Sequence, residues 1–169
     1  MGEMFEANEH LSRELVGLLR EKEVSLSLAE SCTGGLISHL ITQIPGTSKF
    51  YKGSLVAYQP ELKINLLKVD PASIERYQLE SPHVTEEMAQ GMRALTASDI
   101  ACATNGIAGP GPGSSLDIPI GQVFIALASS KRTICHAYQF FGQREDIKLK
   151  ASIQALKLLI DFIKQDNAG

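Results

Sequence analysis

A serine and a cysteine stand beside two glycines where a strand-like run passes into a helix-like run. Residues 28–35 read LAESCTGG; an apolar run that begins at Val24 precedes them, and another that begins at Leu36 follows. The first amide groups of a helix lack intrahelical acceptors, and the helix dipole there favours an anion or a nucleophile. Adjacent glycines are poor helix formers, but they let a ligand approach the backbone closely. Ser31 is therefore a candidate nucleophile.

Two other interpretations of this turn stay open. A serine that precedes a helix is most often an N-cap, whose oxygen accepts a bond from the first turn. Cys32 is a competing nucleophile, because a helix N-terminus can lower the pKa of a thiol. The more common role of such a cysteine is that of a small buried packing residue.

A serine nucleophile needs a base, and Tyr58 and Lys63 are the candidates for that role. Tyr58 ends an apolar strand-like run, and Lys63 follows on a short helix that begins at Pro60. Either side chain accepts a proton near neutral pH only if burial or a nearby cation lowers its pKa. The spacing places both near one strand end. The alternative is that Lys63 is simply solvated, as lysines on short amphipathic helices usually are.

A second candidate binding element is the loop 105–119, which is rich in glycine and proline and follows a buried strand. Its amide groups are suited to a phosphate or a carboxylate, although it matches neither the P-loop nor the dinucleotide fingerprint. A flexible connection is the alternative, but structureless loops of this length are more often functional. Arg144, at the start of the last helix, is either a surface charge or an anion clamp. The four histidines have no metal-ligand spacing, so no metal site is expected.

Apolar periodicity predicts the elements that must position these residues. Helices are expected over 8–22, 33–43, 60–67, from Thr85 onward and over 144–164, and strands over 24–28, 50–58, 100–104, 120–129 and 132–140. The last two strands form a hairpin. Thr85 is expected to cap its helix, and the apolar face of that helix then holds Met88, Met92 and Leu95. The dipeptide 70–71 (DP) ends the helix before it.

Helices alternate with strands for most of the chain, and one hairpin interrupts the alternation. This order predicts a three-layer α/β/α fold around a mostly parallel, mixed sheet of about five to six strands. The chain has 169 residues, of which 44% are hydrophobic. Residues 1–169 are therefore expected to form a single domain with a substantial core.

Composition narrows the function classes. A formal net charge of −3 disfavours general nucleic-acid binding, which needs a basic surface, but it is compatible with a small anionic substrate. Three scattered cysteines give no disulfide framework and favour a cytoplasmic location. The polar N-terminal segment is unlike a signal peptide, and no apolar run reaches the ~18 residues of a membrane span.

The motifs occur in the order seen in the CinA C-terminal domain family, also known as the nicotinamide-nucleotide amidohydrolases (PncC). They are AESCTGG at 29–35, PGTS at 45–48, the segment 58–63, GIAGP at 106–110 and GQR at 142–144. The resemblance covers nearly the whole chain, and the first motif is the most specific. In two-domain members this domain follows a larger pyrophosphatase-type domain, whereas the present chain resembles the free-standing form.

The resemblance implies hydrolysis of nicotinamide mononucleotide to nicotinate mononucleotide and ammonia, in pyridine nucleotide salvage and without a cofactor. It implies a serine nucleophile at Ser31, with the family's tyrosine and lysine at Tyr58 and Lys63. Backbone amides around Thr33 and Gly34 are the expected oxyanion donors. The other expected substrate-binding residues are Glu30, Gly35, Asn105, Gly106, Gly109 and Arg144.

The departures from the family pattern fall mainly in the glycine-rich loop. Asn105 stands where the family has a threonine, Ile118 stands where it has a lysine, and the loop has an apparent extra residue. Near the last helix, Lys148 stands for an arginine. A catalytically silent nucleotide-binding or regulatory protein of the same fold is therefore the alternative prediction. A homodimer is expected because twofold oligomers are common.

Overall fold

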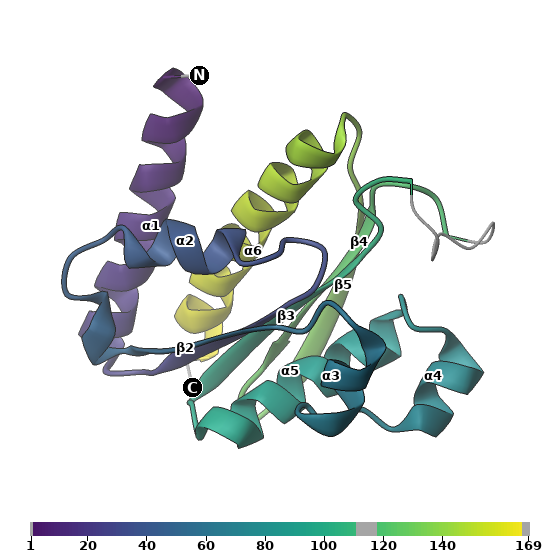
Figure 1. Cartoon of the computed structure of the whole chain (residues 1–169). Coiled ribbons are helices and arrows are strands. Elements are labelled where there is room, and N and C mark those ends of the chain that lie inside the picture. The colour runs from purple at the N-terminus through teal and green to yellow at the C-terminus, as the bar shows by residue number, and fades with distance from the viewer. Residues whose placement is uncertain (1, 111–117, 167–169) are drawn as a thin grey trace.

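The protein consists of three layers, with a five-stranded sheet between two layers of helices (Figure 1). The computed structural model describes residues 2–110 and 118–166, with side chains from residue 8 to residue 165. The helices on one face are α1 (Gly2–Lys22), α2 (Leu36–Thr42) and α6 (Arg144–Asp166). Those on the other face are α3 (Pro60–Asn65), α4 (Pro71–Tyr77) and α5 (Pro82–Thr96). The predicted α/β/α fold class is confirmed.

The sheet has the strand order β2-β1-β3-β4-β5. Its strands are β1 (Leu26–Glu30), β2 (Tyr51–Val56), β3 (Ile100–Gly106), β4 (Gln122–Ala128) and β5 (Thr133–Gln139). β1 pairs in parallel with both β2 and β3, whereas the β3–β4 and β4–β5 pairs are antiparallel. The sheet is therefore mixed, as predicted, and the predicted hairpin is the β4–β5 pair.

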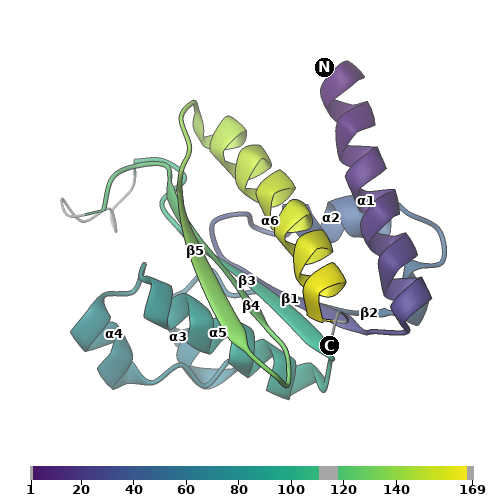
Figure 2. The ribbon, with the colours of Figure 1, turned by 180° about the vertical axis from the view of Figure 1, so that it is seen from behind.

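The two crossover connections between parallel strands lie on opposite faces of the sheet. α2 connects β1 to β2 on the face that also carries α1 and α6, which lie side by side in the reverse view of Figure 2. α3, α4 and α5 connect β2 to β3 on the other face. Glu30 is opposite both Val56 and Thr104, so the three parallel strands end at one edge. A crevice outside the carboxyl ends of such strands is the usual ligand site of open α/β sheets.

The two faces of the sheet are packed differently. Branched and aromatic side chains such as Leu15, Ile37 and Phe162 fill the side that carries α1, α2 and α6. On the other side the sheet presents mostly alanines, and α5 supplies Met88 and Met92. Small side chains let a helix lie close to a sheet. α5 is therefore held tightly against β3 and β4.

The start of α5 differs from the sequence prediction. The helix begins at Pro82, and the Ser81 hydroxyl accepts a bond from the Val84 amide at 3.3 Å. Thr85 is not the cap, because it lies inside the helix and its hydroxyl donates to the Ser81 carbonyl. Proline at the first helical position was the missed signal. The predicted inward face was also wrong at Leu95, whose side chain is exposed.

The dipeptide 70–71 does not only end a helix, as predicted, but also begins one. The Asp70 carboxylate accepts a bond from the Ala72 amide at 2.9 Å, and Pro71 occupies the first turn of α4. A proline that cannot continue one helix is well suited to begin the next. For this reason α4 was not among the predicted helices.

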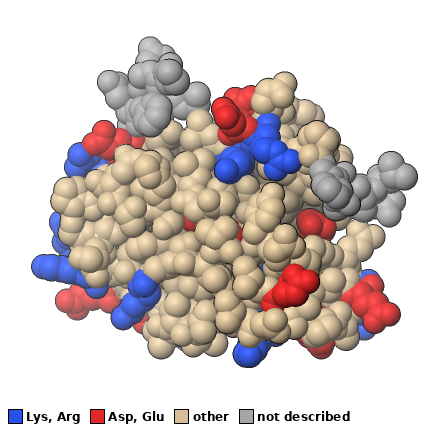
Figure 3. Space-filling model, in the orientation of Figure 1, with Lys and Arg blue, Asp and Glu red and all other residues tan. Residues whose placement is uncertain are grey.

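The surface of the face seen in Figure 3 carries charged side chains of both signs, mostly along its margin. This distribution agrees with the small formal net charge of −3. Within the described residues, no helix is both long and apolar enough to span a bilayer.

Candidate active site

A cavity of about 420 Å³ opens at the edge where the parallel strands end. Its walls come from five segments that are far apart in sequence. They follow β1, follow β2 into α3, connect α4 to α5, follow β3 and begin α6. The side chains on these walls that can do acid–base, nucleophilic or anion-binding chemistry are Ser31, Cys32, Tyr58, Lys63, Glu80 and Arg144.

Ser31 lies directly after β1 and faces this cavity. Its amide donates to the Thr104 carbonyl at 2.9 Å, which extends the β1–β3 pairing by one residue. Its hydroxyl has no hydrogen-bond partner among the described residues. The interpretation of Ser31 as a helix cap is wrong, because Gly35 occupies the N-cap position of α2. The serine hydroxyl is thus presented to the cavity.

Glu30, rather than Ser31, accepts the hydrogen bonds from the first amide groups of α2. Its fully buried carboxylate accepts bonds from the amides of Gly35 at 3.0 Å and Ser38 at 2.9 Å. It also accepts bonds from the Ile37 amide and from the Thr33 hydroxyl. The structure therefore places Glu30, Thr33 and Gly35, which were predicted to bind substrate, behind the turn and outside the cavity lining.

The amide groups of the turn are not equally available as oxyanion donors. The Gly34 amide donates to the Ser31 carbonyl at 3.1 Å. Gly34 also has a left-handed φ of +60°, and a Cβ atom there would lie 3.5 Å from Lys148 Nζ. The amides of Cys32 and Thr33 point at the Cys32 sulfur, where they stabilise its thiolate and lower its pKa. Unlike the amide of Gly34, these two amides have no backbone acceptor among the described residues.

Cys32 is nevertheless not activated. Burial raises the pKa of its thiol to about 12, although the Lys63 charge and the two turn amides act in the opposite direction. The sulfur is therefore protonated at neutral pH, and a thiol is a much weaker nucleophile than a thiolate. The geometry favours the packing role for Cys32.

Lys63 is almost completely buried, with 1% of its surface exposed. Its Nζ atom donates to Asn105 Oδ1 at 3.1 Å. Burial lowers the pKa of its ammonium group, while the charges of Glu80 and Cys32 partly oppose this effect. The alternative of a solvated surface lysine is therefore wrong. A lysine in this environment is more readily neutral than an exposed one and can act as a base.

Asn105 lies behind Lys63 and is not part of the cavity lining. It is 1% exposed, and its Nδ2 atom donates to the Leu79 carbonyl at 2.7 Å. The same side chain accepts the bond from Lys63. It thus ties the lysine to the segment between α4 and α5, and the structure gives it a positioning role instead of the predicted substrate contact.

Tyr58 and Glu80 stand on different walls of the cavity. Tyr58 lies at the rim and is 58% exposed. Burial raises the pKa of the Glu80 carboxyl, against the effects of the Lys63 charge and the Glu80 amide. Glu80 was not among the predicted site residues, because its spacing from Lys63 matches no motif. The only nearby signal was the helix start at 81–82.

The loop after β3 and the start of α6 close the cavity on its remaining side. Gly106 has a φ of +151°, and a Cβ atom there would lie 2.3 Å from the Gln122 carbonyl oxygen. Arg144 donates to the Pro110 carbonyl at 3.1 Å and packs on Gly109. Gly106, Gly109 and Arg144 all line the cavity, as predicted. Residues 111–117 of the predicted anion loop lie outside the described residues.

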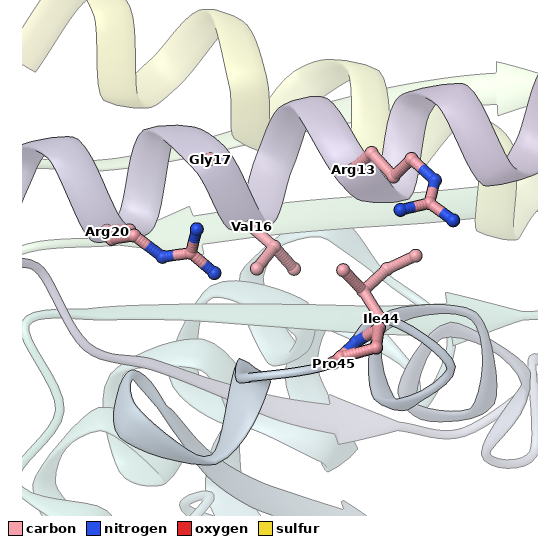
Figure 4. A pocket seen from close by; sticks show the side chains of 6 residues that line it. All are labelled: Arg13, Val16, Gly17, Arg20, Ile44 and Pro45. Carbon is pink, nitrogen blue, oxygen red and sulfur yellow. The ribbon is translucent and has the colours of Figure 1, made fainter.

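A second hollow, of about 270 Å³, lies between α1 and the turn after α2 (Figure 4). Arg13 and Arg20 flank Val16 on one side, and Ile44 and Pro45 form the other. This lining includes no nucleophile and no acid. In the described part of the chain, no cluster of His, Cys, Asp and Glu could hold a metal ion. The cavity beside Ser31 is thus the candidate active site.

Comparisons with known proteins identify the family of the chain. A model of the CinA C-terminal domain matches residues 8–163. A CinA-like protein from Thermotoga neapolitana is 37% identical over 158 residues, which are 94% of this chain and 38% of that protein. A CinA-like protein from Geotalea uraniireducens is 41% identical over 91% of this chain and 36% of its own length. The chain thus spans less than two fifths of these curated relatives.

Solved structures match over almost their whole length. The competence or damage-inducible protein from Enterobacter asburiae superposes with a TM-score of 0.88 at 31% identity, covering 92% of this chain and 98% of that one. The competence damage-inducible protein A from Klebsiella pneumoniae superposes with a TM-score of 0.89 at 30% identity, covering 96% and 99%.

Proposed function

The chain belongs to the CinA C-terminal domain family, and we propose that it is an amidohydrolase that converts nicotinamide mononucleotide to nicotinate mononucleotide and ammonia. The observation that carries the proposal is the meeting of Ser31, Tyr58 and Lys63 on the walls of one cavity. The substrate is taken from the sequence resemblance to the nicotinamide-nucleotide amidohydrolases. The chemistry is supported by the burial of Lys63.

In the proposed reaction, Ser31 Oγ attacks the carboxamide carbon while neutral Lys63 takes the hydroxyl proton. The amides of Cys32 and Thr33 stabilise the oxyanion of the tetrahedral intermediate. The Lys63 ammonium returns the proton to the amide nitrogen as the carbon–nitrogen bond breaks, and ammonia leaves. A water molecule then hydrolyses the acyl-serine ester by the same proton route. Hydrogen bonds between such groups often tighten only when the substrate binds.

The other cavity walls are suited to hold the rest of the nucleotide. Arg144 carries a fixed positive charge beside the amides of Gly106 and Gly109, a combination that binds phosphate. Tyr58 at the rim offers an aromatic face to the pyridine ring. We assign Tyr58 to orientation of the substrate, because its side chain lies exposed at the rim of the cavity.

Ammonia release from nicotinamide mononucleotide tests the proposal directly. We expect steady release by the wild type and a loss of several orders of magnitude in Ser31→Ala, with Cys32→Ala as the matched control that keeps most activity. Calorimetry on the Ser31→Ala variant measures binding without turnover. Binding of the nucleotide without any release by the wild type would instead support the silent binding protein. Turnover by Ser31→Ala within about tenfold of the wild type would exclude Ser31 as the nucleophile.

A further inference from the structure

Lys63 is fixed against a segment that also carries an acid. The Asn105 side chain bonds the Lys63 ammonium through Oδ1 and the Leu79 carbonyl through Nδ2, at 3.1 Å and 2.7 Å. Glu80 is the next residue, and its side chain lines the same cavity as Lys63. One buried amide therefore holds the lysine and the acid-bearing segment in a set arrangement.

Within the described part of the chain, Glu80 carries the one carboxyl group that lines the cavity. The other titratable or charged groups on its walls are Cys32 after β1, Tyr58 after β2 and Arg144 at the start of α6. Cys32 is protonated at neutral pH, since burial raises its pKa to about 12. On α3 itself, Glu61 is exposed and outside the lining. The negative charge that faces Lys63 across the cavity is thus that of Glu80.

We propose that Glu80 is the counter-charge of Lys63, stabilising the ammonium ion that forms when Lys63 accepts the serine proton and thereby setting the pH range of the reaction. The proposal rests on the proposed function, because it assigns a role within the same proton transfer. Nζ of Lys63 bonds to Asn105 and not to the carboxylate. Glu80 therefore acts through the field of its charge and is a positioning residue.

The charge of Lys63 changes during the proposed reaction. The attack of Ser31 Oγ forms a carbon–oxygen bond and moves one proton to Lys63, which changes from neutral to positive. Burial opposes that change, since a charged group in an apolar environment loses hydration. A carboxylate fixed nearby offsets this loss of hydration only after Lys63 has become positive. It therefore stabilises the transition state more than the ground state, and this difference lowers the barrier.

The direction of the Lys63 pKa shift agrees with this geometry. Burial lowers the pKa of Lys63, and the charge of Glu80 raises it again. If glutamine replaces Glu80, that carboxylate no longer opposes the effect of burial on the Lys63 pKa. The pKa of Lys63 should then fall, and neutral Lys63 should be present at lower pH than in the wild type.

The first test is the pH profile of ammonia release by Glu80→Gln, which keeps the size of the side chain. We expect the rising limb of kcat to move toward acid by about one pH unit and the plateau to fall about tenfold. Glu61→Gln is the matched control, because it removes the same charge from an exposed site on the same helix as Lys63. We expect its profile to match the wild type. A Glu80→Gln profile that coincides with the wild type overturns the proposal.

The second test needs no turnover and separates this proposal from the proposed function. Nitrogen-15 NMR of lysine side chains, with Lys63→Met to identify the resonance, follows the protonation of Lys63 without substrate. We expect its midpoint to move toward acid in Glu80→Gln and by a smaller amount in Glu80→Asp. Absent ammonia release with a shifted midpoint would refute the proposed reaction alone. An unshifted midpoint in Glu80→Gln, or in Glu80→Asp if Glu80→Gln does not fold, refutes the counter-charge.

Discussion

The buried Lys63 ammonium donates its hydrogen bond to a side-chain amide, that of Asn105. Asn105 accepts from Nζ on one side and donates to the Leu79 carbonyl on the other, and both Lys63 and Asn105 are about 1% exposed. A buried polar atom that loses its partner carries the full cost of its lost hydration. The asparagine is therefore part of what makes a buried lysine tolerable.

Asn105→Ala should lower both stability and activity, because it leaves the Lys63 ammonium and the Leu79 carbonyl without partners. We expect the free energy of unfolding to fall by about 2–3 kcal/mol, and kcat to fall at least tenfold. Urea unfolding and ammonia release measure the two effects. Asn105→Thr, which restores one oxygen acceptor, should recover part of each. Unchanged unfolding in Asn105→Ala would show that the bridge contributes nothing.

Cys32 should resist alkylation at pH 7, because burial keeps its pKa at about 12. We expect iodoacetamide to leave Cys32 unmodified by mass spectrometry while the protein is folded, and to modify it in urea. Cys32→Ala should keep activity within about threefold of the wild type. Rapid inactivation of the folded protein by iodoacetamide, with the label on Cys32, would make the cysteine the better nucleophile.

At the level of residues, the sequence predicted most of the reactive side chains that line the cavity, but not the contacts that each of them makes. The ends of parallel strands meet at one edge, so Ser31, Tyr58 and Lys63 could be brought together from strand order alone. Glu30 was assigned to substrate binding as a member of the motif AESCTGG at 29–35. Its role as an internal acceptor depends on the side-chain direction at the end of β1, which spacing does not specify.

At the level of elements, α2 has only seven residues and depends on a buried acid. Glu30 accepts four hydrogen bonds from Thr33 and the first turn of the helix, a charge-assisted cap that offsets the missing intrahelical acceptors. The same turn presents Ser31 to the cavity. Stability of α2 and placement of the candidate nucleophile are therefore linked.

Glu30→Gln should destabilise the protein, because an amide NH₂ replaces one accepting oxygen and opposes backbone N–H groups. We expect a loss of about 2–3 kcal/mol in urea unfolding. Glu9→Gln is the control, since Glu9 pairs with Arg13 on the surface and exposed pairs contribute little. Its change should stay within about 0.5 kcal/mol. Equal effects of the two substitutions would contradict the capping role.

Replacing glycine by alanine should change the stability of the protein in opposite directions at two helical positions. A Cβ atom at Gly91 of α5 would lie 1.8 Å from the Leu67 carbonyl oxygen, whereas one at Gly17 of α1 has nothing within 4 Å. We expect Gly91→Ala to cost about 2–3 kcal/mol and Gly17→Ala to stabilise by about 0.5–1 kcal/mol. Thermal unfolding measures both. A neutral Gly91→Ala would mean that α5 is not held tightly against the segment after α3.

Periodicity predicted the strands and the long helices, because their apolar faces are set by the sheet. It failed at the starts of two helices, which are set by a capping side chain and a proline. Ser81 and Asp70 cap helices that begin with a proline, and both starts were misjudged. Leu95 was predicted to be inward, but it lies in the last turn of α5, beyond the methionines that pack on the sheet.

At the level of the whole molecule, the buried lysine links stability to pH. The pKa of Lys63 is lower in the folded state than its ordinary value of 10.5. Between these two values the unfolded chain binds more protons than the folded one, so stability rises with pH across that window. Below the folded pKa, the cost of burying the charged lysine is fully present.

The wild type should therefore gain stability relative to Lys63→Met as the pH rises toward 10.5, the ordinary pKa of a lysine. Urea unfolding of both proteins at several pH values measures this difference, in which the contributions of other groups largely cancel. A constant difference across the range would show that Lys63 has an ordinary pKa in the folded protein.

The expected homodimer and the single domain over residues 1–169 stay predictions, which sedimentation and limited proteolysis can examine.

The insertion of β3 between β1 and β4 has a consequence for synthesis on the ribosome. When residues 1–98 have emerged, Ser31, Tyr58, Lys63 and Glu80 exist, but the strand that carries Asn105 does not. Lys63 then lacks its acceptor, Asn105. β1 has an unpaired edge, and such an edge is prone to non-native pairing. Arg144 and α6 come still later. The nascent chain thus holds every group of the proposed proton transfer before the site has formed, and activity reports that β3 has been added to the sheet.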